Sequence, residues 1–251
     1  MSDHKFQYLL RLADTSLVLS QRLSEWCGKG PALEEDMALT NVALDLLGQA
    51  RLWYAYAGEL DPAGRDEDQL AYLRDAHDFR NLLLAEQPNG HYGETLARQF
   101  YVDAWHYFLQ TALVKSSDRR IAEIAEKSLK EVTYHVRRSS DLIVRLGDGT
   151  EKSRAMMQAA LDDLWMYTGE MFMADSVEEA MVAEGAAPHP ADLRGPWLAH
   201  MKEVCDEATL TMPSPDAFMQ KGGKQGRHTE HLGYLLAEMQ FLQRAYPGAQ
   251  W

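Results

Sequence analysis

Apolar residues recur every three or four positions along most of the chain, which is the spacing of one face of an α-helix. Breaks rich in Gly and Pro separate these periodic stretches. No stretch shows the strict alternation of a half-buried strand, so the sequence predicts an all-α protein. The expected helices span residues 5–26, 33–57, 69–86, 94–114, 118–146, 151–183, 192–210 and 228–246.

Four of these helices stand out for their length, namely 33–57, 94–114, 118–146 and 151–183. Short connections favour antiparallel neighbours, and the insertion before residue 94 gives the chain room to cross over, as in ferritin-like bundles. No hinge linker is evident, so we expect one ferritin-like helical domain over residues 1–251. Helix 33–57 is apolar nearly all round, which indicates a wholly buried helix.

The expected helix 94–114 contains a polar line inside an apolar segment. Asp103 and His106 lie three positions apart, so both side chains lean toward the same side of the helix. A buried polar group is costly without a partner, so such positions indicate a specific contact or a site. The line consists of Gln99, Asp103, His106 and Gln110.

Bundles that hold two metal ions use one Glu from each of two helices and Glu-x-x-His from each of the other two. The carboxylates neutralise and bridge the ions, and each imidazole supplies a nitrogen ligand. Here the second such motif is missing, because Met166 and Met173 stand three positions after Asp163 and Glu170. The ligand-like positions are Asp45, Asp103, His106, Glu131, His135 and Glu170, with Asp163 as an alternative to Glu170.

Each position also has a purely structural interpretation. Asp103 and His106 can bond to each other or to facing helices, and Glu131 with His135 can be a surface pair. Asp45 can form a structural ion pair with an Arg or Lys side chain on a neighbouring helix. The pair His228 and His231 lacks the His-Glu-x-x-His spacing of hydrolytic zinc sites, so a cap and a polar surface are expected there.

Net charge, cysteine content and the absence of targeting segments indicate which partners and which compartment to expect. The chain has 251 residues and a formal net charge of −13, which argues against nucleic acid or an anionic membrane as the main partner. Cys27 and Cys205 are expected to be buried free thiols in a reducing compartment. The N-terminus shows no signal peptide and no stretch suits a membrane span, so a cytoplasmic location is expected.

Several ordered motifs are spread over essentially the whole chain. They are residues 43–51 (ALDLLGQAR), 130–135 (KEVTYH), 145–150 (RLGDGT), 164–170 (LWMYTGE), 228–232 (HTEHL), 236–240 (LAEMQ), Pro247 with Gly248, and Trp251. Together these motifs are far more specific than a lone short pattern, and they resemble the C subunits of bacterial phenylacetyl-CoA epoxidases, also called ring-1,2-phenylacetyl-CoA monooxygenases.

The resemblance implies a ferritin-like bundle that acts as the non-catalytic structural partner of a related catalytic subunit. In that family the catalytic subunit holds the di-iron centre, and a separate reductase carries flavin and iron–sulfur groups. No catalytic, cofactor-binding or metal-binding residue is therefore expected in this chain, and other subunits of the complex are its expected partners. A homodimer of the chain alone remains open. The alternatives are an active di-metal oxygenase or oxidase and a ferritin-like storage or binding protein.

Overall fold

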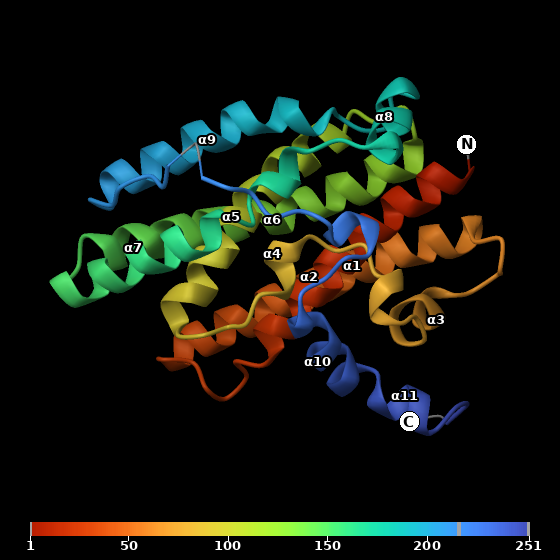
Figure 1. The fold of residues 1–251 in the computed structure, drawn as a ribbon, viewed down its shortest axis with the longest axis horizontal. Helices are drawn as coiled ribbons and strands as arrows, with labels where there is room; N and C mark the ends of the chain where they lie inside the picture. The colour runs from red at the N-terminus through yellow and green to blue at the C-terminus, as the bar shows by residue number, and fades with distance from the viewer. Residues whose placement is uncertain (1, 215–216, 250–251) are drawn as a thin grey trace. The chain divides into compact units, whose positions relative to one another are not determined.

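The structure is a computed structural model that describes residues 2–214 and 217–249. Every regular element in these ranges is helical and none is a strand (Figure 1). The predicted all-α class is therefore confirmed, in agreement with a ferritin-like protein. Trp251, the last residue of the C-terminal motif, lies outside the described ranges. No helix in the described part of the chain is long and apolar enough to cross a membrane.

The chain divides into two compact units, one made of Met1–Pro88 with Gly222–Trp251 and the other of Asn89–Lys221. The single domain expected from the sequence stays a prediction. The first unit is built on α1 (Ser2–Ser24), which packs along α2 (Leu33–Leu60). Its other helices are α3 (Glu67–Tyr72), η1 (Ala76–Asp78), α4 (Leu83–Glu86), η3 (Gly223–Gln225), α10 (Glu230–Met239) and α11 (Phe241–Ala245).

The predicted helix over residues 69–86 is wrong, because the chain there forms three short pieces, α3, η1 and α4. Asp66 caps the start of α3, and a second capping box between Asp75 and Asp78 starts η1. After Tyr72 the backbone turns away so that the backbone N–H of Arg80 donates to Asp14 of α1 at 2.7 Å. A long-range acceptor therefore interrupts a stretch whose apolar spacing is helical.

Two long helices form the centre of the second unit. The predicted helices 94–114 and 118–146 are confirmed as α5 (Tyr92–Leu113) and α6 (Arg119–Gly147), which pack on each other. Asp118 caps α6 by accepting from the backbone N–H groups of Arg120 and Ile121. The unit also contains α7 (Glu151–Trp165), η2 (Gly169–Phe172), α8 (Ser176–Ala183) and α9 (Pro190–Glu207).

The predicted helix over residues 151–183 is also wrong, because α7 ends at Trp165. The Thr168 hydroxyl donates to the Trp165 carbonyl at 2.8 Å, and Asp175 caps a new helix, α8. Gly169 lies so close to Met219 that an added Cβ would be 2.6 Å from its Cγ. The chain therefore makes a short 3-10 turn here, and Glu170 lies in that turn rather than on a long helix.

Two expectations about burial need correction. α2 is not wholly buried, since Leu33, Met37 and Leu44 are 72, 58 and 60% exposed. Cys27 is exposed because it follows the end of α1, whereas Cys205 is buried as expected. Both cysteines are free thiols. The helix expected over 228–246 breaks at Gln240, whose amide donates to the carbonyls of Ala71 and Arg74.

Candidate functional site

The polar line predicted on α5 lies inside the second unit. Gln99, Asp103, His106 and Gln110 are all buried, with at most 5% of each residue exposed. The facing helix α6 also buries polar side chains, namely Ser128, His135 and Ser139. The prediction of a buried polar line is therefore confirmed, and α5 and α6 together supply it.

Asp103 is the only carboxylate of this line on α5. Burial raises the pKa of Asp103 to about 6, although His135, Ser139 and Arg138 of α6 act in the opposite direction. The Gln99 amide donates to the Asp103 carboxylate, but at 3.5 Å this bond is weak. Asp103 is therefore poorly compensated as an anion and takes up a proton at mildly acidic pH.

His106 follows one turn after Asp103. Burial, together with the nearby His135, lowers the pKa of His106 to about 3. The ring stacks on Trp105 with centroids 5.8 Å apart. The imidazole is therefore neutral at physiological pH, which is the protonation state of a metal ligand and also that of a buried structural histidine.

Two further polar side chains in this interior are Gln110 of the line and Ser128 of α6. Within the described residues, the Gln110 amide oxygen, the Gln110 amide nitrogen and the Ser128 hydroxyl oxygen have no hydrogen-bond partner. Buried polar groups without partners lower stability and are rare in folded proteins. The interior between α5 and α6 therefore contains buried polar groups that do not add hydrogen bonds to the fold.

The remaining ligand-like positions do not complete a di-metal set. Glu131 of α6 is half-buried, and the position three later is the exposed Tyr134, with His135 buried one residue beyond. Glu170 is buried in η2, whereas Asp163 points outward on α7 and does not enter the interior. Asp45 is half-buried on α2 and belongs to the first unit. Within each unit, no group of three or more described His, Cys, Asp or Glu side chains is placed to bind a metal ion.

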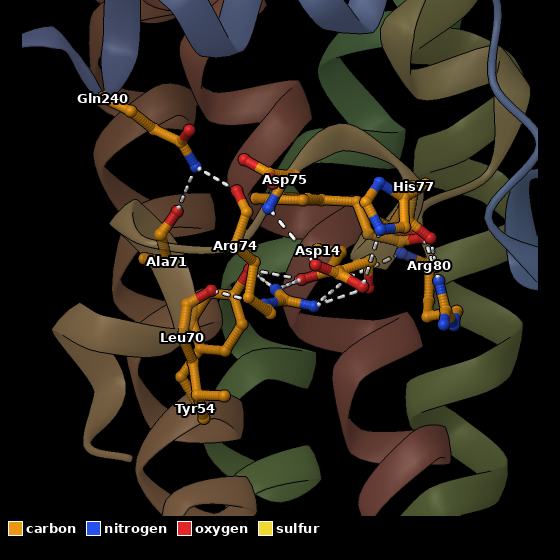
Figure 2. A network of polar contacts seen from close by, with 12 residues as sticks. Asp14, Tyr54, Leu70, Ala71, Arg74, Asp75, His77, Arg80 and Gln240 are labelled. Carbon is orange, nitrogen blue, oxygen red and sulfur yellow. Dashed lines mark hydrogen bonds and ion pairs between the residues drawn. The ribbon is translucent and has the colours of Figure 1, made fainter. Parts of the chain in front are cut away.

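The first unit contains a buried ion pair that sequence reasoning missed (Figure 2). Asp14 of α1 accepts from the hydroxyl of Tyr54 on α2, from the guanidinium of Arg74 and from the backbone of Arg80. Burial acts to lower the pKa of Arg74, but Asp14 outweighs it and holds that pKa above its usual range. Burial and Asp14 both raise the pKa of Tyr54. The available signal was an acid within the apolar face of the expected helix 5–26.

A second buried contact joins the C-terminal segment to α4. His228 Nδ1 lies 2.8 Å from Glu86 Oε2, and His228 Nε2 lies 2.9 Å from the Phe79 carbonyl. Thr229 donates its backbone N–H and hydroxyl to the other Glu86 oxygen, and Asn81 donates to Oε2. The expected polar surface at His228 is therefore wrong, because its side chain is only 5% exposed. Burial lowers the pKa of His228, but Glu86 and the Phe79 carbonyl outweigh it and raise the pKa overall.

The second unit buries the Asp103 carboxylate and the His106 and His135 imidazoles where α5 packs on α6. Inward-facing carboxylate and imidazole side chains are typical of ferritin-like helical bundles. Comparison with known proteins makes this specific. Residues 1–251 match the family described as Phenylacetic acid catabolic protein. The chain is 52% identical over 244 residues to the C subunit of the 1,2-phenylacetyl-CoA epoxidase of Escherichia coli (strain K12), covering 97% of this chain and 98% of the relative. The chain therefore belongs to the phenylacetic acid catabolic protein family, and the resemblance seen in its sequence is confirmed.

Proposed function

We propose that the chain is a non-catalytic structural subunit of a multicomponent di-iron oxygenase that epoxidises phenylacetyl-CoA in aerobic phenylacetate catabolism. The observation that carries the proposal is the 52% identity to an epoxidase C subunit across nearly the full length of both chains. In this role the chain binds a related catalytic subunit and stabilises it. A partner that binds only the folded form adds about 2.7 kcal/mol of stability at a hundredfold excess over Kd.

The donor set of the second unit supports the absence of redox chemistry in this chain. α5 presents an Asp and a His, but α6 presents no Glu-x-x-His, and Glu170 lies in a 3-10 turn instead of on a facing helix. These residues do not fit the four-helix arrangement that binds two metal ions. We therefore infer that this chain binds no cofactor, that the catalytic subunit holds the di-iron centre, and that the reductase carries flavin and iron–sulfur groups.

The proposal extends to partners and location. The chain has 38 acidic and only 25 basic side chains. This negative charge disfavours binding to nucleic acid or an anionic membrane and favours binding to a basic protein surface. The expected partners are the catalytic subunit and other subunits of the epoxidase, in the cytoplasm where coenzyme A thioesters are made and used.

The alternative function is an active di-metal oxygenase or oxidase. It is favoured by one observation, namely that Asp103 and His106 are both buried one turn apart with the imidazole neutral. This alternative also needs ligands from Asp45, from Glu131 and from either Glu170 or Asp163, and it makes the chain active without a related subunit.

Metal analysis combined with reconstitution separates the two functions. The chain, expressed in iron-rich medium, is purified alone and analysed for iron by mass spectrometry. Oxygen consumption with phenylacetyl-CoA and reductase is then measured for the chain, for the catalytic subunit, and for their mixture. We expect no stoichiometric iron in this chain and activity only in the mixture. About two irons per chain, with oxygen consumption by the chain alone, would refute the structural role.

A further inference from the structure

A small open cavity lies in the second unit, beside the 3-10 turn η2. Its volume is about 250 Å³. A cavity of about 150 Å³ already accepts benzene, whereas sites for drug-sized ligands have roughly 300–1,000 Å³. The cavity, which we call the η2 pocket, therefore has room for one ring with a short substituent. Its described lining residues come from α7, the turn around η2, α9 and the segment before η3.

Part of the lining of the η2 pocket is aromatic. Trp165 of α7 stacks on Trp197 of α9 with ring centroids 5.6 Å apart, and the centroid of Phe172 lies 5.1 Å from that of Trp197. The indole N–H of Trp165 donates to the Ser214 carbonyl at 2.9 Å. The indole N–H of Trp197 donates to the Tyr101 carbonyl, also at 2.9 Å. Because these bonds fix the rings before a ligand arrives, little conformational freedom is lost when a flat aromatic ligand binds.

Two methionines also line the η2 pocket. Met219 lies against Gly169, where an added Cβ would be 2.6 Å from the Met219 Cγ. The next residue ties this segment to the turn, because the backbone N–H of Gln220 donates to the Met166 carbonyl at 2.7 Å. Met173 is the second methionine of the lining and is 37% exposed. Thioether side chains are flexible and make favourable contacts with aromatic rings, so this part of the pocket adapts to a ring.

Arg194 gives the η2 pocket its charge, since it is the only charged side chain among the described lining residues. It is exposed on α9 three positions before Trp197, so both side chains lie on the same side of that helix. No described residue forms an ion pair or a hydrogen bond with its guanidinium. A guanidinium is planar, weakly hydrated and suited to bind a carboxylate through two parallel hydrogen bonds. Arg194 is therefore available to pair with an anion in the pocket.

From the aromatic lining and the available guanidinium we propose that the η2 pocket binds a small aromatic carboxylate with a single ring. The ring packs against the three aromatic side chains, and the carboxylate pairs with Arg194. An aliphatic acid lacks the contacts between rings, and a neutral aromatic compound lacks the ion pair. A coenzyme A thioester has no free carboxylate next to its aromatic group and exceeds the volume of the pocket, so the ligand is a free acid.

This binding site goes beyond the proposed function and does not depend on it. The structural role concerns a contact with another subunit, whereas the ligand binds to this chain alone. Binding is therefore measured on the purified chain without partners, and its failure leaves the structural role untouched.

Titration with three matched ligands tests the chemical class. Phenylacetate, phenylacetamide and cyclohexylacetate are each titrated into the purified full chain and followed by ligand-observed NMR. The amide keeps the ring but has no charge, and cyclohexylacetate keeps the charge but has no aromatic ring. We expect phenylacetate to bind with a Kd on the order of 1 mM, as suits about ten non-hydrogen atoms, and both analogues to bind about fivefold more weakly or worse. Equal binding of either analogue, or no binding of phenylacetate at about 10 mM, overturns the proposal.

Variants and labelled tryptophans test the place of binding. Arg194→Gln should weaken phenylacetate binding about fivefold or more. Arg137→Gln, a matched change at an exposed arginine of α6 in the same unit, should leave it unchanged. In chains labelled with fluorotryptophan, the fluorine resonances of Trp165 and Trp197 should shift on titration, and that of Trp53 in the first unit should not.

Replacing single tryptophans by phenylalanine assigns the fluorine resonances, and circular dichroism checks that each variant is folded. Unchanged binding by Arg194→Gln, or shifts confined to other tryptophans, places the ligand elsewhere and contradicts the proposal. If phenylacetate does not bind but Arg194→Gln weakens association with the catalytic subunit, the η2 pocket belongs to that contact and the proposal fails.

Discussion

Asp103 and His106 experience the same burial but respond in opposite directions. Burial disfavours the charged form of each side chain, so it raises the pKa of the carboxyl to about 6 and lowers the pKa of the imidazole to about 3. The imidazole is therefore neutral throughout the physiological range, while the carboxyl carries a poorly compensated negative charge above pH 6. These opposite shifts give two pH dependences that can be measured separately.

His106 should limit stability in acid. Its pKa in the folded state is lower than the usual value near 6.5. As pH falls below 6.5, His106 is therefore protonated in the unfolded chain but not in the folded chain, and this lowers the free energy of unfolding. We expect the difference in unfolding free energy between wild type and His106→Gln to shift against wild type by about 3 kcal/mol between pH 7 and pH 4. Urea unfolding followed by circular dichroism measures this, with the exposed His77→Gln as control. A pH-independent difference would contradict the burial of a neutral ring.

Asp103 should act in the opposite sense. Its folded-state pKa lies above the usual value, so its contribution to stability is present at pH 4 and is lost as pH rises through 6. Relative to Asp103→Asn, wild type should therefore lose about 2 kcal/mol between pH 4 and pH 7. The same urea titration measures it, with Asp163→Asn on the exposed side of α7 as the control. A wild type that gained stability over this range would mean that the carboxylate is compensated.

At the level of elements, the sequence predicts a helix well where caps and apolar spacing agree. α5 and α6 have both, and their predicted bounds are close to those observed. The predictions over 69–86 and 151–183 are wrong because apolar spacing continues through the breaks. The first break depends on Asp14, which is 60 residues from Arg74 in sequence, and the second on the packing of Gly169 against Met219. Contacts of this kind have no local signature.

The ion pair of Asp14 and Arg74 should be a major support of the first unit. Asp14→Asn leaves the guanidinium buried without its counter-charge, which typically costs roughly 3–5 kcal/mol. The matched control is Asp206→Asn, because Lys202 and Asp206 form an ion pair in which both side chains are more than 60% exposed. We expect the control to change stability by less than about 1 kcal/mol. Chemical denaturation measures both, and equal effects would contradict the role of burial.

The contact between His228 and Glu86 should make attachment of the C-terminal segment depend on pH. The pKa of His228 is raised in the folded state, so its contribution is present below the unfolded value and is lost as pH rises through the folded value. Asp14 adds to the effect of Glu86. We expect tryptic cleavage at Arg244 to increase with pH in wild type relative to His228→Gln, whose cleavage should lack this component. His231→Gln serves as control, and parallel curves for wild type and His228→Gln would contradict the prediction.

At the scale of the whole molecule, the candidate site was only partly predictable from the sequence. The polar positions on α5 were predictable because helical spacing places them on one side of an apolar helix. Their lack of a second Glu-x-x-His was also visible, since it needs only the residues themselves. The clusters around Asp14 and Glu86 were not predictable, because each collects partners from segments distant in sequence. The exposure of Leu33, Met37 and Leu44 on α2 was not predictable either, because the apolar composition of that helix indicates burial.

In the proposed complex the catalytic subunit holds the di-iron centre and this chain has a structural role, which can be tested at the polar line on α5. If the polar line on α5 is structural, changing both of its ligand-like groups should leave the chemistry of the assembled enzyme intact. We expect a complex containing Asp103→Asn with His106→Gln to keep the iron content and the kcat of the wild-type complex. Asn and Gln preserve volume and polarity, and circular dichroism with co-purification shows whether the variant folds and assembles. An active centre in this chain predicts loss of the iron bound here, because a neutral amide is a far weaker ligand than a carboxylate or an imidazole. Iron analysis of the variant complex therefore decides between the two even where activity falls for reasons of assembly.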